Sequence, residues 1–130
     1  MKVAIDTSGS IDESTLSDFM SEVAAVLRAY PHVQGACYFA DVEAYGPYPL
    51  DQDLIGRRPE GRGGTSFAPF FDAVGEGHDP ADLLVYFTDG FGSFPPEPPE
   101  APVLWVVTPD GRDNASFPFG DVARMGLGRN

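Results

Sequence analysis

The stretch Lys2-Val3-Ala4-Ile5-Asp6-Thr7-Ser8-Gly9-Ser10 decides the fold of this chain. Its apolar run is short and stops at an aspartate, which is typical of a buried strand that delivers Asp6 to its own carboxyl end. The turn that follows presents Ser8 and Ser10 toward the same point. Carboxylate and hydroxyl oxygens are the ligands of hard divalent cations, and a small ion such as Mg²⁺ keeps some of its waters. The stretch therefore predicts part of a metal site.

An amphipathic helix is predicted directly after this stretch, over about residues 12–29, because apolar residues recur there at steps of three and four. Ser10 and Glu13 have the spacing of a capping box. Taken alone, Ser10 therefore fits a helix N-cap better than a metal ligand. Asp6 and Ser8 beside it favour the metal.

Two strands that are close in sequence follow this helix. Val33 to Ala40 and Val42 to Tyr48 lie too near each other for a crossover helix, so they are expected to pair antiparallel, with the second at a sheet edge. Pro47 fits an edge strand. Asp41 between them is expected either to form the turn or to support the metal site.

A glycine-rich loop precedes the second predicted helix, which covers about residues 67–74. The loop Gly61-Arg62-Gly63-Gly64-Thr65 lets the backbone approach closely and turn sharply. It lacks the Lys-Ser/Thr ending of a nucleotide-binding P-loop. Thr65 is expected at or near the helix N-cap, where its hydroxyl either caps the helix or reaches a metal. The polar residues 50–62 before it are expected to form a solvated loop, whose arginines (Arg57, Arg58 and Arg62) could also form an anion-facing rim.

A second aspartate ends a second buried strand. The apolar run of residues 82–87 stops at Thr88-Asp89-Gly90. The proline-rich residues 94–102 exclude an ordinary helix and predict a stiff connector. Val103 to Val107 is another buried strand, and residues 117–125 are expected to hold one last short strand.

These elements predict an α/β fold with three layers and a mostly parallel central sheet, with one antiparallel edge hairpin and few helices in the C-terminal half. In such Rossmann-like sheets, ligands bind beyond the carboxyl ends of the strands. The missing helices are expected to leave one sheet face thinly covered near Trp105 and the C-terminal strands. The candidate metal ligands all lie in loops at the ligand-binding edge: Asp6, Ser8, Ser10, Thr65 and Asp89.

Composition narrows the classes of function. The 130 residues suit a single domain, 1–130, and we expect it to be excised from a longer protein. The formal net charge of −12 argues against nucleic acid and against an anionic membrane surface. Cys37, the only cysteine, lies in an apolar strand and is expected to be an inert core thiol, which fits the cytoplasm. Neither a signal peptide nor a membrane span is expected.

The three loops, in this order, resemble the metal-ion-dependent adhesion site (MIDAS) of von Willebrand factor A (VWA) domains. Asp6, Ser8 and Ser10 match the D-x-S-x-S pattern of the first loop of that family, Thr65 matches the second loop and Asp89 the third. The resemblance implies that the hydroxyls ligate Mg²⁺ (or Mn²⁺/Ca²⁺) directly, while the aspartates act directly or through water. It also implies an open coordination position for an Asp or Glu of a protein partner. The chain is therefore expected to be a protein-interaction module and not an enzyme.

The compact, helix-poor form is similar to intracellular bacterial VWA-like domains at the C-terminus of metallopeptidase-like proteins. Those are often associated with MoxR-type AAA+ ATPases. The resemblance implies such an ATPase, and an N-terminal metallopeptidase-like domain of the parent chain, as partners in the cytoplasm.

Two other functions stay open. Haloacid-dehalogenase-like phosphatases also place an aspartate after a first strand and use Mg²⁺, but they need a second acid where this chain has Ser8. They also need a well-placed lysine, and Lys2 is the only lysine of the chain. The other alternative is an interaction domain whose metal site is vestigial.

Overall fold

The computed structural model describes residues 1–55, 61–76 and 83–126. A six-stranded sheet in the order β3-β2-β1-β4-β5-β6 forms its centre, and each neighbouring pair is parallel except β2–β3. The predicted α/β fold and its antiparallel edge pair are therefore confirmed. The elements are β1 (Lys2–Asp6), α1 (Glu13–Ala29), β2 (Ala36–Ala40), β3 (Ala44–Pro49), α2 (Gln52–Ile55), α3 (Ala68–Glu76), β4 (Leu84–Thr88), β5 (Val103–Val107), a 3₁₀ turn (Asn114–Ser116) and β6 (Asp121–Arg124).

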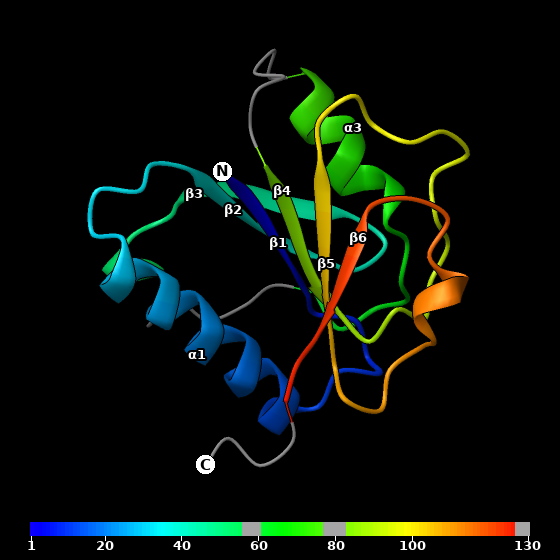
Figure 1. Ribbon diagram of the computed structural model, residues 1–130, viewed down its shortest axis with the longest axis horizontal. Coiled ribbons are helices and arrows are strands. Elements are labelled where there is room, and N and C mark those ends of the chain that lie inside the picture. Colours follow the sequence, from blue (N-terminus) through cyan, green and yellow to red (C-terminus); the bar gives the residue numbers. More distant parts are fainter. Residues whose placement is uncertain (56–60, 77–82, 127–130) are drawn as a thin grey trace.

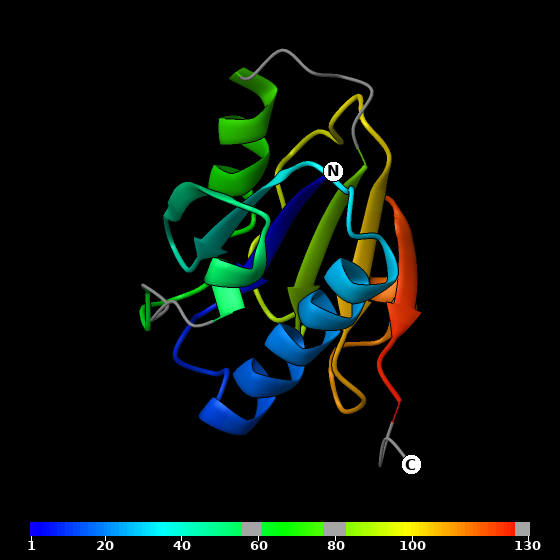
Figure 2. The same ribbon diagram turned by 90° about the vertical axis from the view of Figure 1, so that its left-hand side faces the viewer.

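Helices α1 and α3 lie on opposite faces of the sheet, which gives three layers (Figures 1 and 2). The α1 crossover connects β1 to β2, and the chain returns through α3 to β4 on the other side of β1. The order of the strands therefore reverses at β1. None of the helices in the described ranges is long and apolar enough to cross a membrane.

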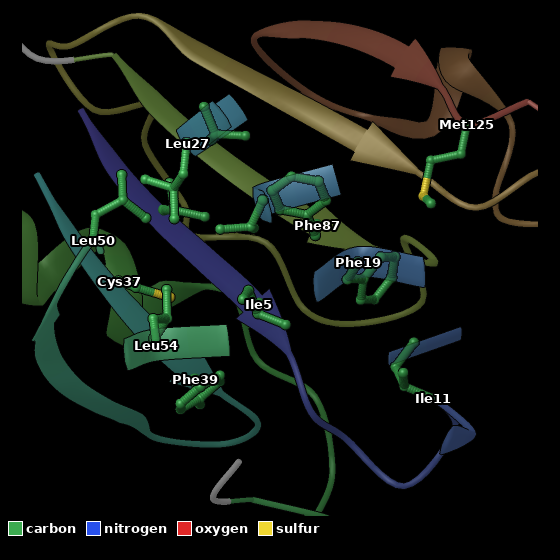
Figure 3. Packing of buried hydrophobic residues seen from close by; sticks show 13 residues of the cluster. Ile5, Ile11, Phe19, Leu27, Cys37, Phe39, Leu50, Leu54, Phe87 and Met125 are labelled. Atoms are coloured by element: carbon green, nitrogen blue, oxygen red, sulfur yellow. The ribbon is translucent and has the colours of Figure 1, made fainter. Parts of the chain in front are cut away.

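The α1 face of the sheet carries an aliphatic core with a few aromatic rings. Phe19, Val23 and Leu27 follow one another at helical steps and are all buried. They pack over alternate residues of the strands, such as Ile5 and Phe87, whose ring centroid lies 5.8 Å from that of Phe19 (Figure 3). The predicted helix 12–29 is thus confirmed by the burial of its apolar stripe.

Aromatic rings fill the opposite face around Trp105, which is 0% exposed. The expectation of thin cover near Trp105 is therefore wrong. The connections that follow β4 and β5 form no α-helix in the described residues, but they place Phe94, Phe117 and Phe119 against the indole, with ring centroids at 5.4, 5.2 and 5.7 Å. Side chains from these irregular segments therefore cover this part of the sheet, a role that helices have elsewhere.

The thinly covered part of the sheet lies instead on the α1 face, over β4 and β5. Leu104 and Val106 are only half-buried there. They line an apolar groove of about 360 Å³ together with Val26 and Tyr30 of the α1 end. Because α1 packs over β1 and toward α2, it leaves this strip of the sheet open.

Some boundaries differ from those expected. The second and third strands begin at Ala36 and Ala44, later than predicted. Residues 50–62 were expected to be only a loop, which is wrong because they contain α2. Its first turn starts where the Asp51 carboxylate accepts a hydrogen bond from the Asp53 amide at 3.0 Å.

Cys37 is buried in the middle of the sheet, and burial raises the pKa of its thiol to about 12. At pH 8 about one thiol in ten thousand is then ionised, and thiolate is the reactive form. We expect a disulfide reagent such as DTNB to leave the folded protein unmodified at pH 8 and to modify one thiol per chain in guanidinium. Rapid modification of the folded protein would show that the strand around Cys37 opens readily.

Candidate metal centre

The carboxyl ends of the parallel strands meet at one edge of the sheet, the lower edge in Figure 1. The reversal of strand order at β1 makes this the place where open α/β sheets bind ligands. The loop after β1 lies here between the ends of β2 and β4. The edge carries buried polar groups that a hydrophobic core would exclude, among them Asp6, Ser8 and Thr88.

Asp6 is completely buried and each of its oxygens accepts hydrogen bonds. Oδ1 accepts from the Ser8 amide at 2.9 Å and from the Ser8 hydroxyl at 2.6 Å. Oδ2 accepts from the Thr88 hydroxyl at 2.6 Å. Asp6 therefore fixes the first loop and the end of β4 in place. Three hydrogen bonds already reach this buried carboxylate, which suits a role through Ser8 or water rather than direct contact with an ion.

Ser10 joins the first loop to the third. Its hydroxyl donates to Asp89 Oδ2 at 3.0 Å, and its oxygen lies 3.3 Å from that of Ser8. Asp89 Oδ1 accepts from the Phe91 amide at 3.0 Å, which holds the carboxylate toward the serines. Segments 79 residues apart in sequence thus meet in one chain of polar groups.

Ser10 is not the cap of α1, contrary to the capping-box interpretation. The N-cap is Asp12, whose carboxylate accepts a hydrogen bond from the Thr15 amide at 2.7 Å. The helix begins at Glu13, so the serine lies two residues too early to cap it. Ser10 is therefore available to the site.

The glycine loop is fastened to the first loop by backbone hydrogen bonds. The Gly9 amide donates to the Gly63 carbonyl at 2.8 Å and the Arg62 amide donates to the Thr7 carbonyl at 2.7 Å. Arg62 has a left-handed φ of 82°, and its guanidinium donates to the Ile11 carbonyl at 2.8 Å. Arg62 thus ties the two loops together. Arg57 and Arg58, the other members of the predicted anion-facing rim, lie outside the described residues.

Asp41 forms the predicted turn and also binds the glycine loop. Its Oδ1 accepts from the Glu43 amide at 2.9 Å, which forms the turn between β2 and β3. Its Oδ2 accepts from the Gly63 amide at 3.0 Å, and its carbonyl accepts from the Ser66 amide. Asp41 therefore holds the glycine loop on both sides of Thr65.

Thr65 lies at the same edge, beside the loop of Asp89. Its carbonyl accepts from the Ser93 amide at 3.4 Å, and a Cβ added to Gly92 would come within 2.6 Å of Thr65 Cγ2. Because α3 starts at Ala68, Thr65 is not at its N-cap, so the capping interpretation is wrong. The structure thus links Asp6, Ser8, Ser10 and Asp89 by hydrogen bonds and places Thr65 against Gly92 and Ser93, which follow Asp89 in the third loop.

Thr88 is the residue that the sequence interpretation missed. It supplies a buried hydroxyl to Asp6 and accepts a hydrogen bond from the Gly90 amide at 3.0 Å. A threonine at the end of a buried strand, directly before an aspartate, was the available signal. It passed unnoticed because threonine is common in strands for reasons of packing alone.

The carboxylates of Asp6 and Asp89 make this edge electrostatically unfavourable when no cation is bound. Burial raises the pKa of Asp6, and the negative charge of Asp89 adds to the effect, although the hydrogen bonds from Ser8 and Thr88 act in the opposite direction. A cation bound between the loops would reduce both costs. The described residues contain no group of three or more His, Cys, Asp or Glu side chains arranged for a metal. A site here would depend on hydroxyls and two carboxylates.

The donors present fit a hard cation. Each serine hydroxyl has one hydrogen, and the nearest carboxylates, Asp6 for Ser8 and Asp89 for Ser10, receive them. The oxygens of Ser8 and Ser10 lie 3.3 Å apart, so the two hydroxyls and the two carboxylates form one compact group of oxygen donors. Neighbouring ligands of an octahedral Mg²⁺ lie about 3 Å apart, given metal–oxygen distances of about 2.1 Å, and those of Ca²⁺ slightly farther. Ser8, Ser10 and Asp89 would hold such an ion, with Asp6 and Thr65 beside them.

Comparison with known proteins gives the same fold. The crystal structure of an aerotolerance-related membrane protein from Bacteroides fragilis NCTC 9343, with multiple mutations to serines, is 12% identical and superposes with a TM-score of 0.67. The match covers 97% of this chain and 90% of that one, and at this identity it shows the fold alone. No curated protein matches the chain. The model of the VWA-like domain family (DUF2201) matches residues 1–126. The chain therefore belongs to the VWA-like domain family.

Proposed function

We propose that this chain is a divalent-metal-dependent protein-interaction module. Ser8, Ser10, Thr65 and Asp89 hold Mg²⁺ (or Mn²⁺/Ca²⁺), and Asp6 orients Ser8. One coordination position stays open for an Asp or Glu of a partner. The observation that carries the proposal is the pair of serine oxygens 3.3 Å apart, each within hydrogen-bond distance of a carboxylate, Asp6 for Ser8 and Asp89 for Ser10.

The acidity of the chain is part of the proposal. A net charge of −12 repels acidic partners at long range, so a metal is needed to bring a carboxylate to this edge. The same charge disfavours nucleic acid and anionic membranes as partners. We propose a cytoplasmic location, with a MoxR-type AAA+ ATPase or a metallopeptidase-like domain of the parent chain as the protein that supplies the acid.

A docking role fits the geometry of Asp6 better than catalysis does. A phosphatase of this type would use this aspartate as a nucleophile, which requires an accessible oxygen. Asp6 is 0% exposed and three hydrogen bonds occupy its oxygens. An acid at the position of Ser8 is also missing. We therefore propose that the ion acts as a bridge between proteins and not in a reaction.

Metal binding is expected to raise thermal stability. An ion at a hundred times its dissociation constant stabilises the folded protein by about 2.7 kcal/mol, or roughly 5–10 °C in Tm for a chain of this size. The measurement is a thermal melt in EDTA, MgCl₂ and MnCl₂, with NaCl of equal ionic strength as the control for simple screening. Ser10→Ala changes an exposed side chain and serves as the site control, since it removes one proposed ligand. Identical melts in EDTA and MgCl₂ for the parent protein would favour a vestigial site.

Removing Asp41 is expected to weaken metal binding without removing a ligand. Asp41→Ala frees the Gly63 amide and the Glu43 amide, so the glycine loop loses its anchor beside Thr65. Residues that support metal ligands from behind typically change affinity by about 10–100-fold. Titration calorimetry with Mn²⁺ measures the change, and Asp41→Asn should recover part of it because one amide oxygen still accepts. An unchanged affinity would mean that the glycine loop takes no part in the site.

A further inference from the structure

Two large apolar side chains are exposed beside the candidate metal centre. Phe91 is 54% exposed and Val42 is 52% exposed. Both follow strands that end at this edge, Val42 after β2 and Phe91 after β4. Since β2 and β4 flank β1, the two residues lie in the loops that follow the strands on either side of the one that leads to Ser8 and Ser10.

Contacts connect both residues to the loops of the site. Val42 Cγ1 would lie 3.2 Å from a Cβ added to Gly64, so the valine rests on the glycine loop directly before Thr65. Phe91 follows Asp89 by two residues, and its amide donates to the Asp89 carboxylate. Gly92 beside it contacts Thr65. Val42 and Phe91 are thus each attached to a loop of the site, Val42 through the glycine loop and Phe91 through the loop of Asp89.

We infer that this edge recognises an extended peptide segment with the pattern apolar-x-acid-x-apolar, whose apolar side chains pack on Val42 and Phe91. The inference rests on the proposed function, because the central acid completes the metal site. It names the partner by its chemistry: an unfolded tail or loop of another protein with one acid between two apolar residues.

The spacing follows from strand geometry. Neighbouring strands lie about 4.8 Å apart, so the ends of β2 and β4 are separated by about 10 Å across β1. In an extended peptide, residues two apart point to the same side and advance by about 3.3 Å each. The side chains two positions before and after the acid therefore face the same way as the acid and lie about 13 Å apart, within reach of Val42 and Phe91. Side chains next to the acid point away.

Two peptides of identical composition test the register. Acetylated and amidated Leu-Ser-Asp-Ser-Leu places leucines on the same side as the acid, and Ser-Leu-Asp-Leu-Ser places them on the other. Binding is followed by chemical-shift changes of the amide resonances in MgCl₂ and in EDTA, up to millimolar peptide. We expect the first peptide to bind about tenfold more tightly than the second in MgCl₂, and neither to bind in EDTA. In Val42→Ser/Phe91→Ser the preference should vanish, while the Mg²⁺-induced rise in Tm stays as in the parent protein.

The outcomes separate this inference from the function on which it rests. Equal binding of both peptides, or no binding of either to a protein that does bind Mg²⁺, overturns the inference and leaves the metal-dependent function standing. A protein that does not bind Mg²⁺ but still prefers the first peptide, through Val42 and Phe91, overturns the proposed function and keeps the apolar recognition. A preference that persists in the double variant shows that other residues read the peptide and also overturns the inference.

Discussion

Asp6→Asn is expected to abolish the stabilisation by Mg²⁺, because the cation loses the negative charge behind its proposed ligands, and at the same time to raise the stability of the metal-free protein. The substitution keeps the shape of a side chain that is completely buried. The amide oxygen still accepts from the Ser8 amide and hydroxyl, and the amide nitrogen donates to the Thr88 oxygen once the threonine hydroxyl turns away. A buried negative charge next to Asp89 is lost, which removes a cost that burial and repulsion impose in the absence of a cation.

The expected gain in EDTA is roughly 1 kcal/mol, the size commonly found when a functional site is relieved of an unfavourable arrangement. In MgCl₂ the order reverses, because the parent protein gains the binding free energy and the variant does not. Thermal melts of the parent protein and of Asp6→Asn, each in EDTA and in MgCl₂, measure this reversal in the order of stability. Asp12→Asn is the matched control, since it removes the same charge two residues after Ser10 while Asn still caps α1.

A variant that responds to Mg²⁺ like the parent protein would exclude Asp6 from the site. A variant that is less stable than the parent in EDTA would mean that the three hydrogen bonds outweigh the cost of the buried charge. The Asp12→Asn control separates either result from a general effect of net charge.

The ends of the strands could be predicted from the sequence because their chemistry changes abruptly there. In β1 and β4 a continuous apolar run stops at or just before a buried aspartate or threonine, and this contrast identified Asp6 and Asp89. The parallel order of the sheet then followed from the alternation of strands with helices. Together these observations were enough to place both aspartates at one edge.

The contacts between loops were not predictable in the same way. Ser10 had a sound local explanation as a helix cap, and only the position of Asp89, 79 residues away, shows which partner its hydroxyl takes. Thr65 and Asp41 are related through backbone atoms of the glycine loop, which have no sequence signature. A local sequence pattern shows that a side chain such as Ser10 could either cap a helix or join the site. Only the tertiary fold shows which of the two contacts it makes.

The cover of the sheet was mispredicted for a related reason. Few helices in the C-terminal half suggested an open face near Trp105, since helices are the usual cover of parallel strands. The sequence does not show that Phe94, Phe117 and Phe119 turn inward from segments without an α-helix. The periodicity that reveals a helix is missing from such segments, so their packing becomes visible only in the structure.

Trp105→Ala is expected to cost about 3–5 kcal/mol of the free energy of unfolding, the range for removing a large buried aromatic side chain. Trp105 touches rings from several segments and stacks on Tyr86 at 5.3 Å. Its indole nitrogen donates to the Phe119 carbonyl at 2.9 Å, and that acceptor would lose its partner. Domains of this size have about 5–15 kcal/mol in total, so the variant lies near the limit of folding.

Leu104→Ala is the matched control, because Leu104 precedes Trp105 on the same strand but is half-buried at the groove of the opposite face. It should cost less, about 1–2 kcal/mol, since part of its apolar surface stays in contact with water in the folded protein. Urea unfolding followed by circular dichroism compares the two, because removing the only tryptophan also removes the fluorescence probe. Should Leu104→Ala be the more costly substitution, the open face of the sheet would lie over Trp105 after all, and the aromatic cover from the irregular segments would be wrong.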